Sequence, residues 1–205
     1  MSFVSRVSIR KAAFIKALAL PFALLTSAGI VAQSSSAAFT ASTANPTNSW
    51  TAGQVVLTDD DGGATPTTGT AMFTAVKLKP GSTAQKCIVV SSTSTVASTL
   101  KLYSSAVTTT NALSTYLDLV IEEGTGGSFS TCTGFTSVAT DFTGTLASFG
   151  TSATGFGSAV GSFSLTGTPT ETRSYRFTYT VNAAAPNTAQ NGTAGATFVW
   201  EADSV

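Results

Sequence analysis

The chain has 205 residues, with ten basic residues, ten acidic residues and no histidine. Catalysis by a Ser-His-Asp or Cys-His arrangement is excluded because no imidazole is present to accept the proton, and zinc sites built on imidazole are excluded for the same reason. Four of the basic residues lie within the first 16 positions, so the rest of the chain is net acidic. A net acidic chain offers no cationic surface to phosphates, and we expect no nucleic-acid partner.

The N-terminal part of the chain has the composition of an export signal. Its basic residues precede an uncharged stretch, residues 17–32, which is short for a membrane-spanning helix of about 20 residues but fits the apolar core of a signal. Small residues follow, and we place cleavage after Ala37 or Ala38. The sequence therefore predicts a signal peptide over 1–38 and a single secreted domain over 39–205, released or held at the cell surface without a membrane segment. The alternative is an uncleaved anchor.

The densest acidic cluster is formed by Asp59, Asp60 and Asp61, which precede Gly62. Hard cations such as Ca²⁺ bind several oxygen ligands, so these carboxylates are the chain's candidate metal ligands. The cluster does not match the twelve-residue calcium loop, because no glutamate stands at the required distance. We therefore favour a solvated turn, and we expect no cofactor.

Cys87 and Cys132 are the chain's two cysteines. Outside the cytosol, two thiols in one chain usually pair, so export predicts a disulfide between them. Closing a loop of this length stabilises the fold by about 4 kcal/mol in the chain-entropy model. The alternative is two buried free thiols.

Alternation of apolar and polar residues with a period of two predicts several half-buried strands. Threonine, valine and aromatic residues, which are frequent in these stretches, suit a pleated sheet. Seven to nine short strands separated by polar turns predict an all-β fold, an antiparallel, jelly-roll-like β-sandwich. The strand stretches are 100–102, 116–122, 175–181 and 198–200, and the turn stretches are 59–63, 79–81, 123–127 and 191–192.

Asp118, Glu122 and Glu123 are the acidic residues from which a catalytic pair for glycoside hydrolysis could be drawn. Adjacent strand residues point to opposite faces of a sheet, so Glu122 and Glu123 cannot flank one bond. Asp118 and Glu122 share a face, which has the pattern of a solvent side. We therefore predict that the protein is not an enzyme.

Residues 124–168 differ from the rest of the chain. They hold 19 serines and threonines, ten glycines and a single charged residue, Asp141, and six phenylalanines recur at nearly every seventh position. A seven-residue step suits a helical stripe, but each glycine disfavours a helix by about 1 kcal/mol. We predict a low-complexity insertion whose phenylalanines dock on the sandwich, with a short helix near residues 145–149. The alternative is an apolar surface for self-association.

Several motifs resemble the TasA/camelysin family of secreted biofilm-matrix and spore-coat-associated proteins of Gram-positive bacteria. Their order along the chain matches that family, whereas the cysteine pair and the composition of residues 124–168 depart from it. The matching motifs are Ala37-Ala38-Phe39-Thr40, the stretch 50–57 (WTAGQVVL), Leu78-Lys79-Pro80-Gly81, Tyr175-Arg176-Phe177, Ala189-Gln190-Asn191-Gly192 and the stretch 198–202 (FVWEA).

The resemblance implies a jelly roll that assembles into extracellular fibres, in which the N-terminal segment of one subunit adds as a strand to the next. The sequence offers an uncharged segment for this role, and such a segment can complete another subunit's sheet edge. We therefore expect a structural matrix protein whose partners are copies of itself. The self-association strand is Ala38, Phe39, Thr40, Ala41, Ser42 and Thr43.

Three alternatives stay open at this point. Residues 38–43 can instead form the first strand of their own sheet. The family is also described as a metallopeptidase, an activity that this histidine-free chain gives no motif for. A monomeric surface or glycan-binding module is the third, with Trp50 and Trp200 as stacking platforms, although we favour packing of both indoles in the core.

Overall fold

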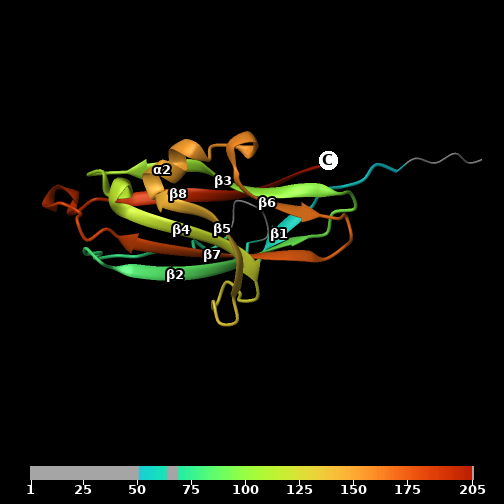
Figure 1. The fold of residues 1–205 in the computed structure, drawn as a ribbon, viewed down its shortest axis with the longest axis horizontal. Coiled ribbons are helices and arrows are strands. Elements are labelled where there is room, and N and C mark those ends of the chain that lie inside the picture. Colours follow the sequence, from blue (N-terminus) through green and yellow to red (C-terminus); the bar gives the residue numbers. More distant parts are fainter. Residues whose placement is uncertain (1–50, 64–68, 205) are drawn as a thin grey trace, which may run out of the picture. The chain divides into compact units, whose positions relative to one another are not determined.

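The computed structural model describes residues 51–63 and 69–204, which form a sandwich of two antiparallel sheets (Figure 1). The larger sheet has the strand order β1-β2-β7-β4-β5 and the smaller has the order β6-β3-β8. The strands are β1 (Leu57–Asp59), β2 (Thr83–Ser92), β3 (Ser98–Thr109), β4 (Leu117–Thr125), β5 (Thr136–Thr145), β6 (Val160–Leu165), β7 (Glu171–Val181) and β8 (Ala194–Ser204). One α-helix, α2 (Leu146–Ser152), and three 3-10 helices, η1 (Leu113–Tyr116), η2 (Phe156–Ser158) and η3 (Asn187–Ala189), complete the described elements.

The core lies between the two sheets, where alternate residues of each strand meet. On β7, Tyr175 and Phe177 are 1% and 0% exposed. Phe177 is paired in register with Ile121 of β4 on one side of the strand, and its ring packs on Phe198 of β8 in the opposite sheet at 4.6 Å between centres. The period-two pattern of the sequence thus becomes one buried row per strand.

The structure confirms the all-β sandwich predicted from the sequence. The four predicted strand stretches fall on β3, β4, β7 and β8, except that Tyr116, the first residue of the second stretch, ends η1. The turn expected at 79–81 precedes β2, with Gly81 at a φ of 83°. At 123–127 the prediction is partly wrong, because β4 continues to Thr125 and the turn starts at Gly126.

The prediction that residues 124–168 form an insertion also needs correction. This stretch contributes β5, α2 and β6, so it builds part of both sheets rather than decorating them. Serine and threonine supply the outward rows of these strands, which is why low complexity coexists with regular pairing. The expected docking of the phenylalanines is confirmed for Phe129, Phe142, Phe149 and Phe163, which lie in or against the core.

Helix α2 begins where Thr145 caps it, since the Thr145 hydroxyl accepts the Ser148 amide at 3.1 Å. Leu146 and Phe149 turn one face of this short helix into the core, and Phe149 is fully buried. Because a helix of seven residues is not stable alone, this burial holds it in place. Within 51–63 and 69–204, none of the helices has the length and apolar character of a membrane span.

Candidate assembly edges

Self-association through strands requires a sheet edge with free backbone groups, so the outer strands are the candidate sites. The larger sheet ends at β1 and β5, and the smaller ends at β6 and β8. Proteins usually protect such edges by keeping the strand short, by bulges, or by proline and lysine. The four edges differ in which of these protections they carry.

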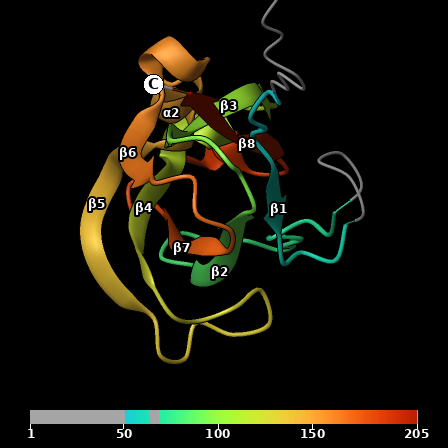
Figure 2. The ribbon, with the colours of Figure 1, turned by 90° about the vertical axis from the view of Figure 1, so that its right-hand side faces the viewer.

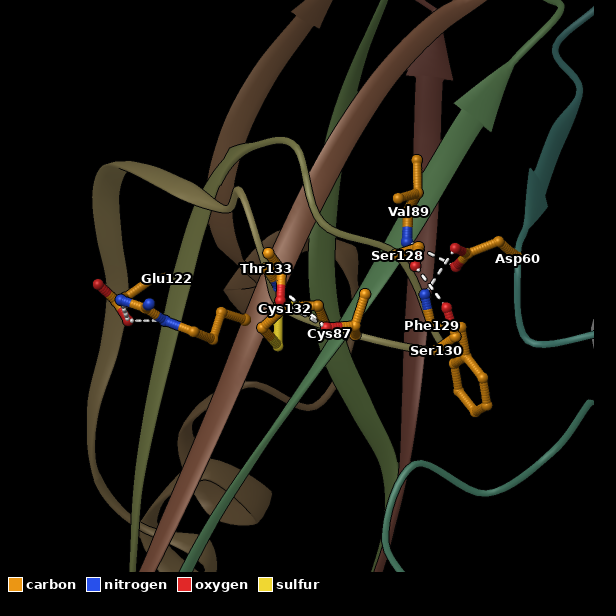
Figure 3. The surroundings of a disulfide bond; sticks show 11 residues. Asp60, Cys87, Val89, Glu122, Ser128, Phe129, Ser130, Cys132 and Thr133 are labelled. Atoms are coloured by element: carbon orange, nitrogen blue, oxygen red, sulfur yellow. Dashed lines mark hydrogen bonds and ion pairs between the residues drawn. A yellow bond between two sulfur atoms is a disulfide. The ribbon is translucent and has the colours of Figure 1, made fainter.

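The β1 edge is short and is extended by the side chain of Asp60. β1 pairs with β2 through three residues and ends at Asp59. Beyond it, Asp60 Oδ1 accepts the Val89 amide at 2.8 Å and Asp60 Oδ2 accepts the Phe129 amide at 2.7 Å (Figure 3). The carboxylate therefore takes the place of a strand residue at the point where β1 stops, and it ties β2 to the loop that carries Phe129.

That loop, residues 126–135, connects β4 to β5, and we call it the strap. It projects from the end of the hairpin and reaches across the outer face of the larger sheet to β2 (Figures 2 and 3). Gly126 and Gly127 start it at φ values of 77° and 70°, which favour glycine. Ser128 and Thr131 exchange two backbone hydrogen bonds of 2.7 and 3.1 Å, which close a tight turn. Hydrogen bonds within the strap thus fix the shape of its turn.

A disulfide joins the strap to β2, as predicted from the sequence: Cys132 is bonded to Cys87, with 5.2 Å between the Cα atoms. Cys87 points to the outer face of the sheet, yet it is 0% exposed. Ser174 of β7 faces the same way and is 4% exposed, and a Cβ at Gly124 would clash with the carbonyl oxygen of Thr136. The disulfide and the strap therefore bury a patch of the outer face.

Two cations pack on aromatic rings of the strap. The guanidinium of Arg176 lies 4.7 Å from the centre of the Phe135 ring while its Nη2 pairs with Glu122 at 2.7 Å. Lys86 Nζ lies 4.2 Å from the centre of the Phe129 ring. Contacts of this kind at partly exposed positions contribute on the order of 0.5–1 kcal/mol each.

The β5 and β6 edges lie side by side and close that side of the sandwich (Figure 2). The pairing of β5 with β4 is interrupted twice, between Ile121 and Glu122 and between Glu123 and Gly124. β6 has only six residues, and Gly161 within it adopts a φ of 72°. Irregular or short strands of this kind are poor templates for another strand.

β8 is the long edge. It pairs with β3 along its whole length, and the described part of the chain places no strand on its other side. Phe198, Trp200 and Ala202 face the larger sheet and remain half-buried; the Trp200 ring packs on Tyr175 at 5.5 Å and on Phe177 at 6.0 Å. The strand contains neither lysine nor proline, although it carries Glu201 and Asp203, and its pairing with β3 has one irregularity, between Ser104 and Ala106. Of the four edges, β8 is thus the longest, and its pairing is interrupted less often than that of β5.

The two sheets also differ in width, and the narrower one ends at β8. Five strands face three, and Figure 2 shows β8 on the side of the sandwich where β1 lies. Part of the inner face of β7 is covered by coil, where Phe73 packs edge-on against Tyr179 at 5.1 Å. A strand added beside β8 would widen the smaller sheet towards the width of the larger one.

A buried charged cluster lies between the sheets. Arg173 Nη2 donates to Glu123 Oε1 at 2.6 Å, and the two side chains are 11% and 12% exposed. Among the described residues, Glu123 Oε2, Asp141 Oδ2 and Arg173 Nε are buried without a hydrogen-bond partner. Burial, and then the negative charge of Glu123, raise the pKa of Asp141 to about 7. A Cβ at Gly161 would lie 3.0 Å from Asp141 Oδ2, so the glycine allows this close approach.

The three aspartates proposed as metal ligands do not converge. Asp59 Oδ1 accepts the Asp61 amide at 3.1 Å, Asp61 Oδ1 accepts the Gly63 amide at 2.9 Å, and Asp60 turns away to β2. Burial is the main cause that raises the pKa of Asp59. Within 51–63 and 69–204, no three Cys, Asp or Glu side chains form a group that could hold a metal. The cluster instead organises a turn and the end of β1.

The acidic residues tested as a catalytic pair also have structural partners. Glu122 and Glu123 lie on opposite faces, as predicted, and Glu122 accepts Arg176 Nε at 2.8 Å on the outer face. Asp118 accepts Asn182 Nδ2 at 3.1 Å. The Trp200 indole packs against the core, whereas Trp50 lies outside the described residues.

Sequence reasoning missed the Glu123–Arg173–Asp141 cluster and the strap. One signal was available, because Arg173 has the same strand parity as Tyr175 and Phe177 and so had to face the core. No signal was available for Asp141, whose position depends on the irregular pairing of β5.

The proposed self-association strand, residues 38–43, lies outside the described residues. No protein-family model and no curated protein matches the sequence. The family resemblance carried by the motifs therefore stays a prediction.

Proposed function

We propose that the chain is an exported structural protein that self-associates into fibres, with residues 38–43 of one copy adding as a strand to β8 of the next. The observation that carries this proposal is the long β8 edge, with its half-buried row Phe198, Trp200 and Ala202. Backbone hydrogen bonds give such an interaction its affinity, and side-chain packing gives it direction. The proposal gives the chain no catalytic role.

Export is supported by two independent features. The first is the signal-like composition of residues 1–38. The second is the Cys87–Cys132 disulfide, a bond that persists in oxidising compartments and is rare in the cytosol. Cleavage at the predicted position would leave Phe39 near a new N-terminus, where the donor strand is free to reach another copy.

The donor segment and β8 have matching chemistry. Phe39, Ala41 and Thr43 share one face of an extended segment. Placed beside β8, that face would extend the row formed by Phe198 and Trp200, burying apolar surface at about 25 cal/mol per Å². No charge in the donor opposes pairing, since residues 38–43 are uncharged.

Fibre formation by the exported, oxidised protein tests the proposal. Deleting residues 38–43 should abolish the fibres seen by electron microscopy, and Phe39→Lys should do the same because it places a charge against the apolar row. Thr40→Lys is the matched control, since its side chain lies on the opposite face and fibres should persist. Undiminished fibres from the deletion variant would rule the proposal out.

The acceptor is tested separately on β8. Ala202 belongs to the half-buried row of this strand, and Ala202→Lys places a charge against the apolar face of the donor. We expect this variant to lose the ability to extend fibres, whereas Thr197→Lys, exposed on the opposite face of the same strand, keeps it. Equal fibre yields from the two lysine variants would move the acceptor away from β8.

A further inference from the structure

The contacts around the strap differ greatly in strength. Asp60, which holds the amides of Val89 and Phe129, is exposed, so water competes for these hydrogen bonds. The contacts of Phe129 and Phe135 with Lys86 and Arg176 are similarly weak. The Cys87–Cys132 bond is covalent, so it dominates the attachment of the strap to β2.

The tip of the strap also lies at the edge of β2 that β1 leaves uncovered. β1 covers β2 only from Val90 to Ser92. Asp60 and Phe129 stand at the next positions, beside Val89 (Figure 3), and the Phe129 ring lies against Lys86. In the described part of the chain no strand pairs with β2 between Thr83 and Val89 on this side, so the tip of the strap is what covers this stretch of the edge.

We propose that the Cys87–Cys132 disulfide is a redox latch: closed, it keeps the strap on the β2 edge, and reduced, it frees this edge to pair with a second copy of the chain. The second copy is the favoured occupant because its β8 edge carries Glu201 and Asp203, which complement Lys86 once Phe129 has left. The latch acts on β2, so it does not depend on the donor segment of the proposed function.

The opening reaction needs a thiol reductant. A dithiol such as dithiothreitol supplies two electrons and two protons: the Sγ–Sγ bond breaks, each cysteine becomes a thiol, and the reductant closes to a cyclic disulfide. Because Cys87 is fully buried, attack should begin at Cys132, which is partly exposed.

Hydrogen exchange and sedimentation test the latch on a chain lacking residues 38–43, which separates it from the proposed fibre. Mild reduction, or the double variant Cys87→Ser/Cys132→Ser, should speed exchange of the Phe129 amide, which leaves Asp60 with the strap, by about tenfold and convert monomers into oligomers. With the disulfide intact, Asp60→Asn should speed exchange at the Val89 and Phe129 amides, and Asp118→Asn, on β4, should leave them unchanged.

Three results would overturn the latch. The first is a Phe129 amide that stays protected after reduction. The second is a freed Phe129 amide in a chain that stays monomeric at every concentration. The third is loss of protection across β7, residues 171–181, by both routes, because the disulfide would then support the whole fold rather than one edge.

Discussion

Arg173 and Glu123 form an ion pair of 2.6 Å between the two sheets, whereas Arg176 and Glu122 form one of 2.7 Å on the outer face. The inner side chains are 11% and 12% exposed, and the outer ones are 28% and 17% exposed. The same pair of residue types thus occurs twice on neighbouring strands in two environments. This allows the cost of burial to be measured within one protein.

Replacing each arginine by methionine makes that measurement. Arg173→Met leaves the buried Glu123 carboxylate without its partner, and we expect the free energy of unfolding to fall by about 3 kcal/mol. Arg176→Met breaks the more exposed pair and should cost about 1 kcal/mol or less. Urea unfolding of the two variants checks the difference, and equal costs would show that the inner pair is as well solvated as the outer one.

Asp141 should make stability depend on pH near neutrality. Its pKa of about 7 in the folded chain lies above the ordinary 3.8, so between these values the folded chain binds more protons than the unfolded chain. Stability from this group is therefore full at low pH and is lost as the pH rises through about 7. Loss of the proton leaves two carboxylates, Asp141 and Glu123, facing one guanidinium, that of Arg173, beside Tyr175, whose pKa is raised by burial.

Melting temperatures between pH 5 and 8 measure this effect against two asparagine variants. Asp141→Asn stays neutral, so its melting temperature should lose the downward slope of the wild type. Asp203→Asn, on an exposed position of β8, should keep that slope. The explanation fails if Asp141→Asn and the wild type have the same pH dependence.

The phenylalanines of residues 124–168 should differ sharply in their contribution to stability. Phe149 is fully buried and packs on Phe142 and Phe198, with 4.9 and 5.7 Å between ring centres. Phe149→Ala should therefore cost about 3–5 kcal/mol. Phe156 is half-buried beside Lys101, and Phe156→Ala should cost about 1 kcal/mol. Thermal or urea unfolding checks the ranking, which a uniform cost along the series would contradict.

The strands that sequence predicts well here are those with strict alternation. Tyr175 and Phe177 alternate with polar residues, and burial of one face fixes their orientation without knowledge of the partner strands. The paired cysteines are predictable in the same way, because two thiols in a chain with a signal-like N-terminal composition leave few options. These features can be predicted because they depend only on the local alternation of residues or on the number of cysteines.

What the sequence does not reveal depends on distant partners. Asp60 looks like one of three aspartates in a solvated turn, yet its carboxylate bonds to Val89 and Phe129, which are 29 and 69 residues away along the chain. β5 is hidden by low complexity, because a strand of serine, threonine and glycine gains its stability from pairing with β4 rather than from its own apolar row. Such contacts appear only once the strands are assembled.

The disulfide also has a mechanical consequence. Cys87 and Cys132 are separated by 45 positions, and their Cα atoms are 5.2 Å apart. When the chain is pulled from its two ends, the segment between them cannot extend while the bond is intact. At about 3.4 Å per stretched residue, this withholds about 150 Å of contour length. Single-molecule stretching should show this increment only after reduction, so the oxidised protein is the less extensible material under load.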